Sequence, residues 1–132
     1  MLQRYNYISR GIMKQSALSI LVFGVYMLGQ GVILFFAPNF LLGLFGIPET
    51  NEFWVKVVAI ALLILSYYYI RAASLDVQTF FQLSTEGRTI QFVLFTILVF
   101  AMDAPKILIA LSFFELLSAL WTFLALKKEK LA

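Results

Sequence analysis

The feature that most constrains this chain is an unbroken apolar stretch of membrane-spanning length near its start. Residues 16–37, SALSILVFGVYMLGQGVILFFA, contain no charged side chain. A helix needs about 20 mostly apolar residues to cross the hydrocarbon layer of a bilayer. Arg4, Arg10 and Lys14 precede the stretch as in a signal peptide, but the run is too long and no small-residue cleavage motif follows it. We therefore predict a retained membrane-spanning helix.

The composition supports lipid as the solvent of the whole chain. Of its 132 residues, 62% are hydrophobic and only 13% are charged. Soluble domains usually have about 45–50% apolar and about 25% charged residues. A chain this short leaves much of its surface exposed, so it cannot hide such an excess in a water-soluble core.

Three further apolar stretches predict an all-α integral membrane four-helix bundle that forms one domain over residues 1–132. The predicted spans are about 16–37, 53–71, 79–102 and 106–126. The segment FLLGLFGI lies between Pro38 and Pro48. It is too short to span the bilayer and too apolar for a free loop, so we expect a short interfacial segment on the outer surface.

The third span has two alternative starting points. A helix over residues 89–102 would be only about 21 Å long, against about 30 Å of hydrocarbon. Extension backwards through DVQTFFQLSTEG gives the required length, but it carries Glu86, Gly87 and Arg88 into the membrane. In the alternative, Arg88 extends to the cytoplasmic surface.

The distribution of basic residues predicts the orientation. Four spans place both termini on one side of the membrane, together with the loop between the second and third helices. Eight basic residues fall on that side, namely Arg4, Arg10, Lys14, Arg71, Arg88, Lys127, Lys128 and Lys130. Only Lys56 and Lys106 fall on the other side. Because basic residues concentrate in cytoplasmic segments, we expect a multi-pass protein of the inner (plasma) membrane with both termini in the cytoplasm.

Glu115 is the most costly side chain to place in the bilayer, because it lies near the middle of the fourth span. A carboxylate there costs at least ~2.5–3.5 kcal/mol on insertion scales and normally faces the bundle interior. The residues that share its helix face are small or polar: Ser112, Ser118, Ala119 and Thr122. Two hypotheses stay open, a functional site and a protonated glutamate that hydrogen-bonds a neighbouring helix.

Partners for Glu115 follow from depth in the membrane. Tyr26 and Gln30 share one face of the first helix, and Tyr26 and Glu115 both lie about 15–16 Å from the cytoplasmic end of their spans. If the third helix begins near Asp76, Arg88 reaches a similar level and could pair with Glu115 through two parallel bonds.

Arg71 follows the run Tyr67–Tyr69 and is either an interfacial anchor or the lower wall of a polar pocket. The candidate binding site therefore consists of Glu115, Arg88, Tyr26, Gln30 and Arg71.

The absence of Cys and His removes thiolate and imidazole ligands, and we expect no metal and no cofactor. Our first functional hypothesis is a non-enzymatic accessory or self-associating membrane protein. The second is a binder or carrier of a small lipophilic or anionic molecule in a pocket around Glu115, and the third is a membrane enzyme that uses Glu115 as acid or base. The expected partners are membrane lipids and either further copies of the chain or a larger membrane complex, but not nucleic acid.

Several segments resemble small four-helix bacterial inner-membrane proteins that are broadly DoxX-like in layout. These segments are FFAPNFLLGLFGIP, YYYIRAA, EGR and FELLSALWT. The resemblance implies a four-helix bundle with Arg71, Arg88 and Glu115 in its recognisable segments. DoxX-like proteins have been linked to quinone-related respiratory chemistry, but the resemblance transfers no quinone or metal site to residues of this chain.

Overall fold

The computed structural model describes residues 13–131, and the regular elements among them are all α-helices. The helices are α2 (Gln15–Phe36), α3 (Pro38–Leu44), α4 (Trp54–Ser74), α5 (Gln78–Met102) and α6 (Ile107–Leu131). Four of them, α2, α4, α5 and α6, are long and apolar enough to cross a membrane, which confirms the predicted all-α class with four candidate spans. Arg4 and Arg10, two of the basic residues counted above, lie outside the described residues.

The segment after Pro38 forms the short helix α3. Proline lacks the N–H that would continue α2, but it is well suited to the first turn of a new helix. Leu41 of α3 packs in a small apolar cluster with Leu34 of α2 and Ala59 of α4. The short apolar segment thus covers one end of the α2–α4 pair.

The third long helix, α5, has the earlier of the two starting points that the sequence allows. The chain turns after α4 at Asp76, whose φ of 54° is left-handed, and α5 begins two residues later. Its 25 residues give a length of about 37 Å. Glu86, Gly87 and Arg88 therefore belong to the helix and not to a loop.

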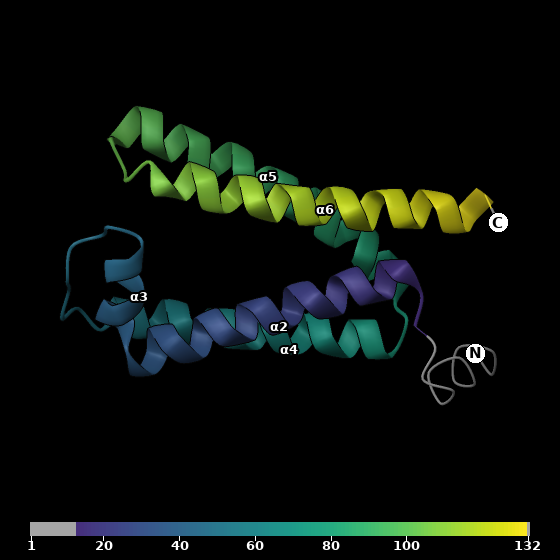
Figure 1. Cartoon of the computed structure of the whole chain (residues 1–132), viewed down its shortest axis with the longest axis horizontal. Helices are drawn as coiled ribbons and strands as arrows, with labels where there is room; N and C mark the ends of the chain where they lie inside the picture. The colour runs from purple at the N-terminus through teal and green to yellow at the C-terminus, as the bar shows by residue number, and fades with distance from the viewer. Residues whose placement is uncertain (1–12, 132) are drawn as a thin grey trace.

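The four long helices form two hairpins that meet at one end of the molecule. Figure 1 shows α2 and α4 side by side in one layer, α5 and α6 in the other, and a separation that widens towards α3. At the narrow end, Ser16 donates from its backbone N–H and its hydroxyl to the Glu129 carboxylate, at 3.1 and 2.7 Å. Lys14 also pairs with Asp76 at 3.3 Å. These contacts hold the start of α2, the end of α6 and the α4–α5 turn together.

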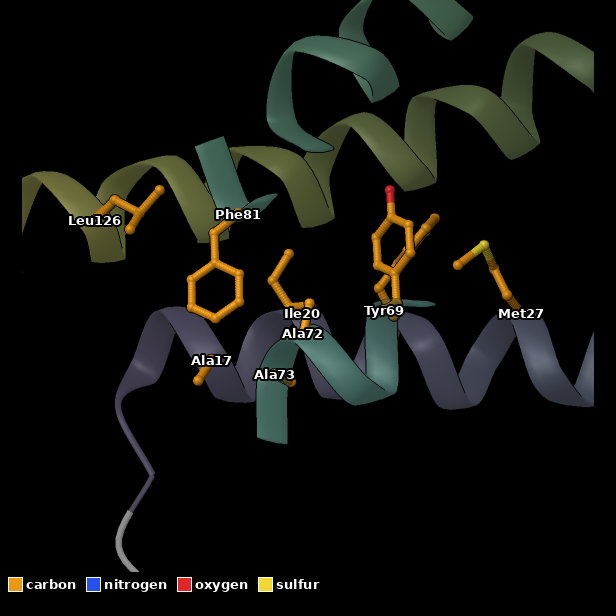
Figure 2. Packing of buried hydrophobic residues seen from close by; sticks show 9 residues of the cluster. Ala17, Ile20, Met27, Tyr69, Ala72, Ala73, Phe81 and Leu126 are labelled. Carbon is orange, nitrogen blue, oxygen red and sulfur yellow. The ribbon is translucent and has the colours of Figure 1, made fainter. Parts of the chain in front are cut away.

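The apolar core lies at this narrow end and includes side chains from all four long helices. Figure 2 shows Ile20 of α2, Tyr69 of α4, Phe81 of α5 and Leu126 of α6 in one buried cluster. The second cluster, at the α3 end, contains no residue of α5 or α6 among those described. The hairpins are therefore joined mainly at one end, and this joint positions the site described below.

Close packing of α2 on α4 depends on Gly24, and we expect Gly24→Ala to destabilise the fold by about 1–3 kcal/mol. A Cβ atom at this position would lie 3.0 Å from Ile70 Cγ1 and 3.1 Å from Tyr69 Cβ, so these α4 side chains would have to give way by a few tenths of an ångström. Gly29→Ala is the matched control, because its Cβ would meet no atom within 4 Å. Unfolding in mixed micelles, followed by circular dichroism, measures both variants. Equal stability of the two would contradict the predicted close contact.

Candidate functional site

Arg88 lies at the joint between the hairpins and contacts all three other long helices. Its side chain is only 2% exposed, although it carries a full positive charge. The guanidinium carbon lies 4.7 Å from the ring centre of Phe23 on α2 and 5.9 Å from that of Tyr69 on α4. Both distances fall within the range of cation–π attraction. The remaining contacts, to α6, are hydrogen bonds.

The hydrogen bonds of Arg88 all end on neutral oxygen atoms. Nε donates to the Ser84 carbonyl at 3.2 Å, and Nη2 donates to Ser84 Oγ at 3.0 Å and to Thr122 Oγ1 at 3.2 Å. Nη1 donates to Ser118 Oγ at 2.8 Å. A guanidinium has five N–H donors, so beside these four bonds one N–H of Nη1 has no acceptor among residues 13–131. Among residues 13–131, no carboxylate oxygen lies within 4.0 Å of the guanidinium nitrogens.

The serine hydroxyls can accept from Arg88 because each donates its own hydrogen to its helix backbone. Ser84 Oγ donates to the Phe81 carbonyl at 2.8 Å, and Ser118 Oγ donates to the Glu115 carbonyl at 2.6 Å. Their lone pairs are therefore available to the guanidinium. This arrangement solvates the cation with neutral groups, and Glu115 attracts its charge from beyond ion-pair distance.

Glu115 is 9% exposed and accepts a hydrogen bond from the Gln91 side chain of α5. Of the other residues of its predicted face, Ser112, Ala119 and Thr122 are also buried and Ser118 is half-buried, which confirms that this face of α6 points inward. The direct Arg88–Glu115 pair considered above is not formed. Because α5 and α6 run antiparallel, Gln91 lies opposite Glu115, and Arg88 lies about one turn further on, opposite Ser118 and Thr122.

The structure brings only some of the other predicted site residues into contact. Gln30 donates from Nε2 to the Tyr26 hydroxyl at 2.9 Å, but no hydrogen bond links this pair to Glu115 in the described part of the chain. The Tyr26 ring instead packs on Phe114 with ring centres 5.8 Å apart. Arg71 is exposed near the end of α4 and is not among the contacts of the buried cluster.

A groove between α2 and α6 lies directly beside Arg88. It has a volume of about 360 Å³ and is mostly apolar. We call it the inter-hairpin groove, and its walls are Ser19, Val22, Phe23, Tyr26, Phe114, Leu117, Ser118 and Trp121. Phe23 and Ser118 touch both the groove and the guanidinium. The groove and the guanidinium are therefore adjacent.

Sequence reasoning missed several members of this site. Gln91 and Ser84 share the helix face of Arg88, three residues after it and four before it, so their spacing was the available sign. Ser19, whose hydroxyl lies 2.7 Å from that of Thr122, is a buried polar residue on the apolar helix α2. Tyr69 belongs to the run Tyr67–Tyr69, in which the sequence alone singles out no residue. Only its burial distinguishes it from the exposed Tyr67 and Tyr68.

Within residues 13–131, no group of three or more acidic side chains is placed to hold a metal ion. Comparison of the chain with protein-family models, with curated proteins and with solved structures gives no match. The resemblance to DoxX-like proteins therefore stays a prediction. The class that the fold supports is that of a helical protein with four candidate membrane spans.

Proposed function

We propose that this chain is a non-enzymatic, multi-pass membrane protein that binds a small lipophilic anion in the inter-hairpin groove. Arg88 supplies the positive charge that the anion recognises. The observation that carries the proposal is the burial of this guanidinium among neutral hydrogen-bond acceptors only. This is the second of the three functional hypotheses from the sequence, with Arg88 in place of Glu115 as the residue that recognises the ligand.

The charge of Arg88 is the energetic reason to expect an anion. A cation taken out of water loses several kcal/mol of solvation, and buried charges are usually paired. Charged residues inside membrane proteins commonly mark a substrate or ion pathway. An incoming carboxylate would accept from the remaining N–H of Nη1 and replace Ser118 as the second acceptor, which gives a charge-assisted bond.

The lining of the inter-hairpin groove indicates that the part of the ligand beyond its anionic group is apolar. Ligand pockets are typically about 300–1,000 Å³ and mostly apolar with few polar groups. The groove fits this description, with four aromatic side chains and two serines in its wall. The groove lies between α2 and α6, and the two hairpins diverge towards α3 (Figure 1). A hydrophobic carboxylic acid or a phenolate matches both parts of the site.

The catalytic alternative has weaker support. Glu115 is held by the neutral amide of Gln91 and is not part of the wall of the inter-hairpin groove. A single carboxylate without a nucleophile or second acid–base group is a poor catalytic arrangement. Self-association and an accessory role stay predictions.

For the membrane, we propose the inner (plasma) membrane with both termini in the cytoplasm and α3 on the outer surface. Arg88 is buried and no longer counts as a loop residue, which leaves seven basic residues against two. The contact of Ser16 with Glu129 supports termini on one side, because it joins the start of α2 to the end of α6.

Binding of a dansyl-labelled undecanoic acid to the purified protein tests the proposed function. We expect Arg88→Met to weaken binding about 30-fold, since a hydrogen-bonded charge contact of about 2 kcal/mol is lost. The affinity of Arg88→Lys for the acid should lie between those of the unaltered chain and Arg88→Met, because lysine keeps the charge but lacks the planar, forked set of donors of arginine. The methyl ester of the same probe should bind equally to all variants. Arg71→Met is the matched control and should bind like the unaltered chain.

A stability measurement separates loss of the ligand from loss of the fold. Ser84 and Ser118 keep their backbone acceptors when Arg88 is replaced by methionine, so no buried hydroxyl loses its acceptor. Replacement of a buried charge by an apolar side chain of similar size is often neutral or stabilising. A stable Arg88→Met protein that still binds the acid more tightly than the ester would refute the proposal.

A further inference from the structure

A second groove runs along the α5–α6 hairpin, outside the Arg88 site. It has a volume of about 920 Å³, and six residues of α6 and five of α5 line it. The α6 side is almost entirely apolar, with Phe113, Leu116, Leu120 and Phe123 along its length. Figure 1 shows the two helices side by side over this stretch. The apolar α6 wall of the groove suits an acyl chain, whereas the α5 wall is mostly polar, with Gln82, Thr85, Glu86 and Thr89.

This groove continues into a polar hollow at the end of the hairpin where α5 begins. The hollow has a volume of about 340 Å³ and shares Gln82, Thr85 and Phe123 with the apolar groove. Its further lining includes Gln78, Thr79, Lys127 and Lys130, which are two basic and two neutral polar side chains. The two hollows therefore form one continuous surface with an apolar body and a basic end.

The charges around this surface favour one orientation of an amphipathic anion. Among the residues that the structure describes, no acidic side chain lines the polar hollow. Glu129 lies between the two lysines in sequence, but its carboxylate accepts from Ser16 on α2. Glu86 lines the apolar part and repels an anion from the middle of the groove. The first turn of α5 has no side-chain cap, so its N–H groups and the positive end of the helix dipole add to the attraction.

From this geometry we propose that the α5–α6 groove binds an anionic phospholipid. The phosphate headgroup lies between Lys127, Lys130 and the start of α5, and one acyl chain follows Phe123, Leu120 and Leu116 towards Phe113. Basic pockets between helices at the membrane surface are the usual sites for anionic headgroups. This site shares one lining residue, Leu117, with the inter-hairpin groove, and its lining includes neither Arg88 nor the side chains that Arg88 hydrogen-bonds, so it does not depend on the function proposed above.

Native mass spectrometry of the purified protein with phosphatidylglycerol and with phosphatidylcholine tests this site. We expect Lys127→Gln and Lys130→Gln each to weaken phosphatidylglycerol binding about fivefold, because each basic residue near an anionic lipid contributes about 1 kcal/mol. Lys128→Gln is the matched control. It removes the same charge from the same turn, but Lys128 is not part of the hollow, so binding should not change. Binding of phosphatidylcholine should be weak and equal in all these variants.

Two further experiments distinguish binding of a whole lipid from binding of its headgroup alone. Leu120→Trp, at a 49% exposed position, fills the acyl groove and should reduce phosphatidylglycerol binding while all basic residues stay in place. Inorganic phosphate at millimolar concentration should not displace the lipid. The proposal is overturned if Lys128→Gln weakens binding as much as Lys127→Gln, if the two lipids bind equally, or if phosphate displaces the lipid. Arg88→Met should leave phosphatidylglycerol binding unchanged, so this test and that of the inter-hairpin groove can fail separately.

Discussion

Replacement of Arg88 by glutamate should destabilise the fold by about 3–5 kcal/mol and loosen the joint between the hairpins. The new carboxyl group would meet the electron-rich faces of Phe23 and Tyr69 where a cation now lies. The two serine hydroxyls beside it already donate to backbone carbonyls. A second buried acid would also be introduced near Glu115. A charged or protonated glutamate therefore has no favourable set of partners at this position.

Two measurements check this prediction. The free energy of unfolding in mixed micelles should fall for Arg88→Glu, whereas the control Arg71→Glu should change it by no more than about 0.5 kcal/mol, because Arg71 is exposed. The chain contains no cysteine, so Val22→Cys and Trp121→Cys introduce two unique sites for spin labels on α2 and α6. The distance between the labels should increase and broaden when Arg88→Glu is added. An unchanged distance with unchanged stability would show that Arg88 does not join the hairpins.

The four long helices could be predicted because the information is local. Each needs only a stretch of sufficient length and hydropathy, bounded by Pro38, Pro105 or a run of lysines. The start of α5 is different, because residues 78–88 are polar enough for a loop. What extends the helix is a non-local gain: only in a helix do Ser84 and Arg88 share a face that can meet Ser118 and Thr122 of α6.

The inward face of α6 could also be predicted, since helical periodicity places Glu115, Ser118 and Thr122 on one side. The partner of Glu115 could not be predicted from the sequence. Depth along a helix gives the level of a residue in the membrane but not the rotation of the neighbouring helix. Tyr26 has the right level, yet Gln91 makes the contact, because the α5–α6 turn fixes which residues lie opposite each other.

The contact between Ser19 and Thr122 is a short, fully buried polar contact between the hairpins, and Ser19→Leu should cost about 3 kcal/mol or more. Both side chains are fully buried, and their hydroxyl oxygens lie 2.7 Å apart. A leucine at position 19 adds bulk where α2 crosses α6, and it removes one of the hydrogen-bonding partners of Thr122. The hairpins can accommodate it only by moving apart, which also weakens the nearby cluster around Arg88.

Ser19→Ala separates the effect of the lost hydrogen bond from the effect of the added bulk, because it removes the hydroxyl and adds no volume. It should cost only about 1 kcal/mol, the usual net value of one hydrogen bond. Val25→Leu adds volume at an exposed position of the same helix and should change the stability little. Unfolding in mixed micelles measures all three variants. If Ser19→Leu were as stable as Ser19→Ala, α2 and α6 would not be in close contact at this point, and the groove beside them would lose the wall that gives it a shape.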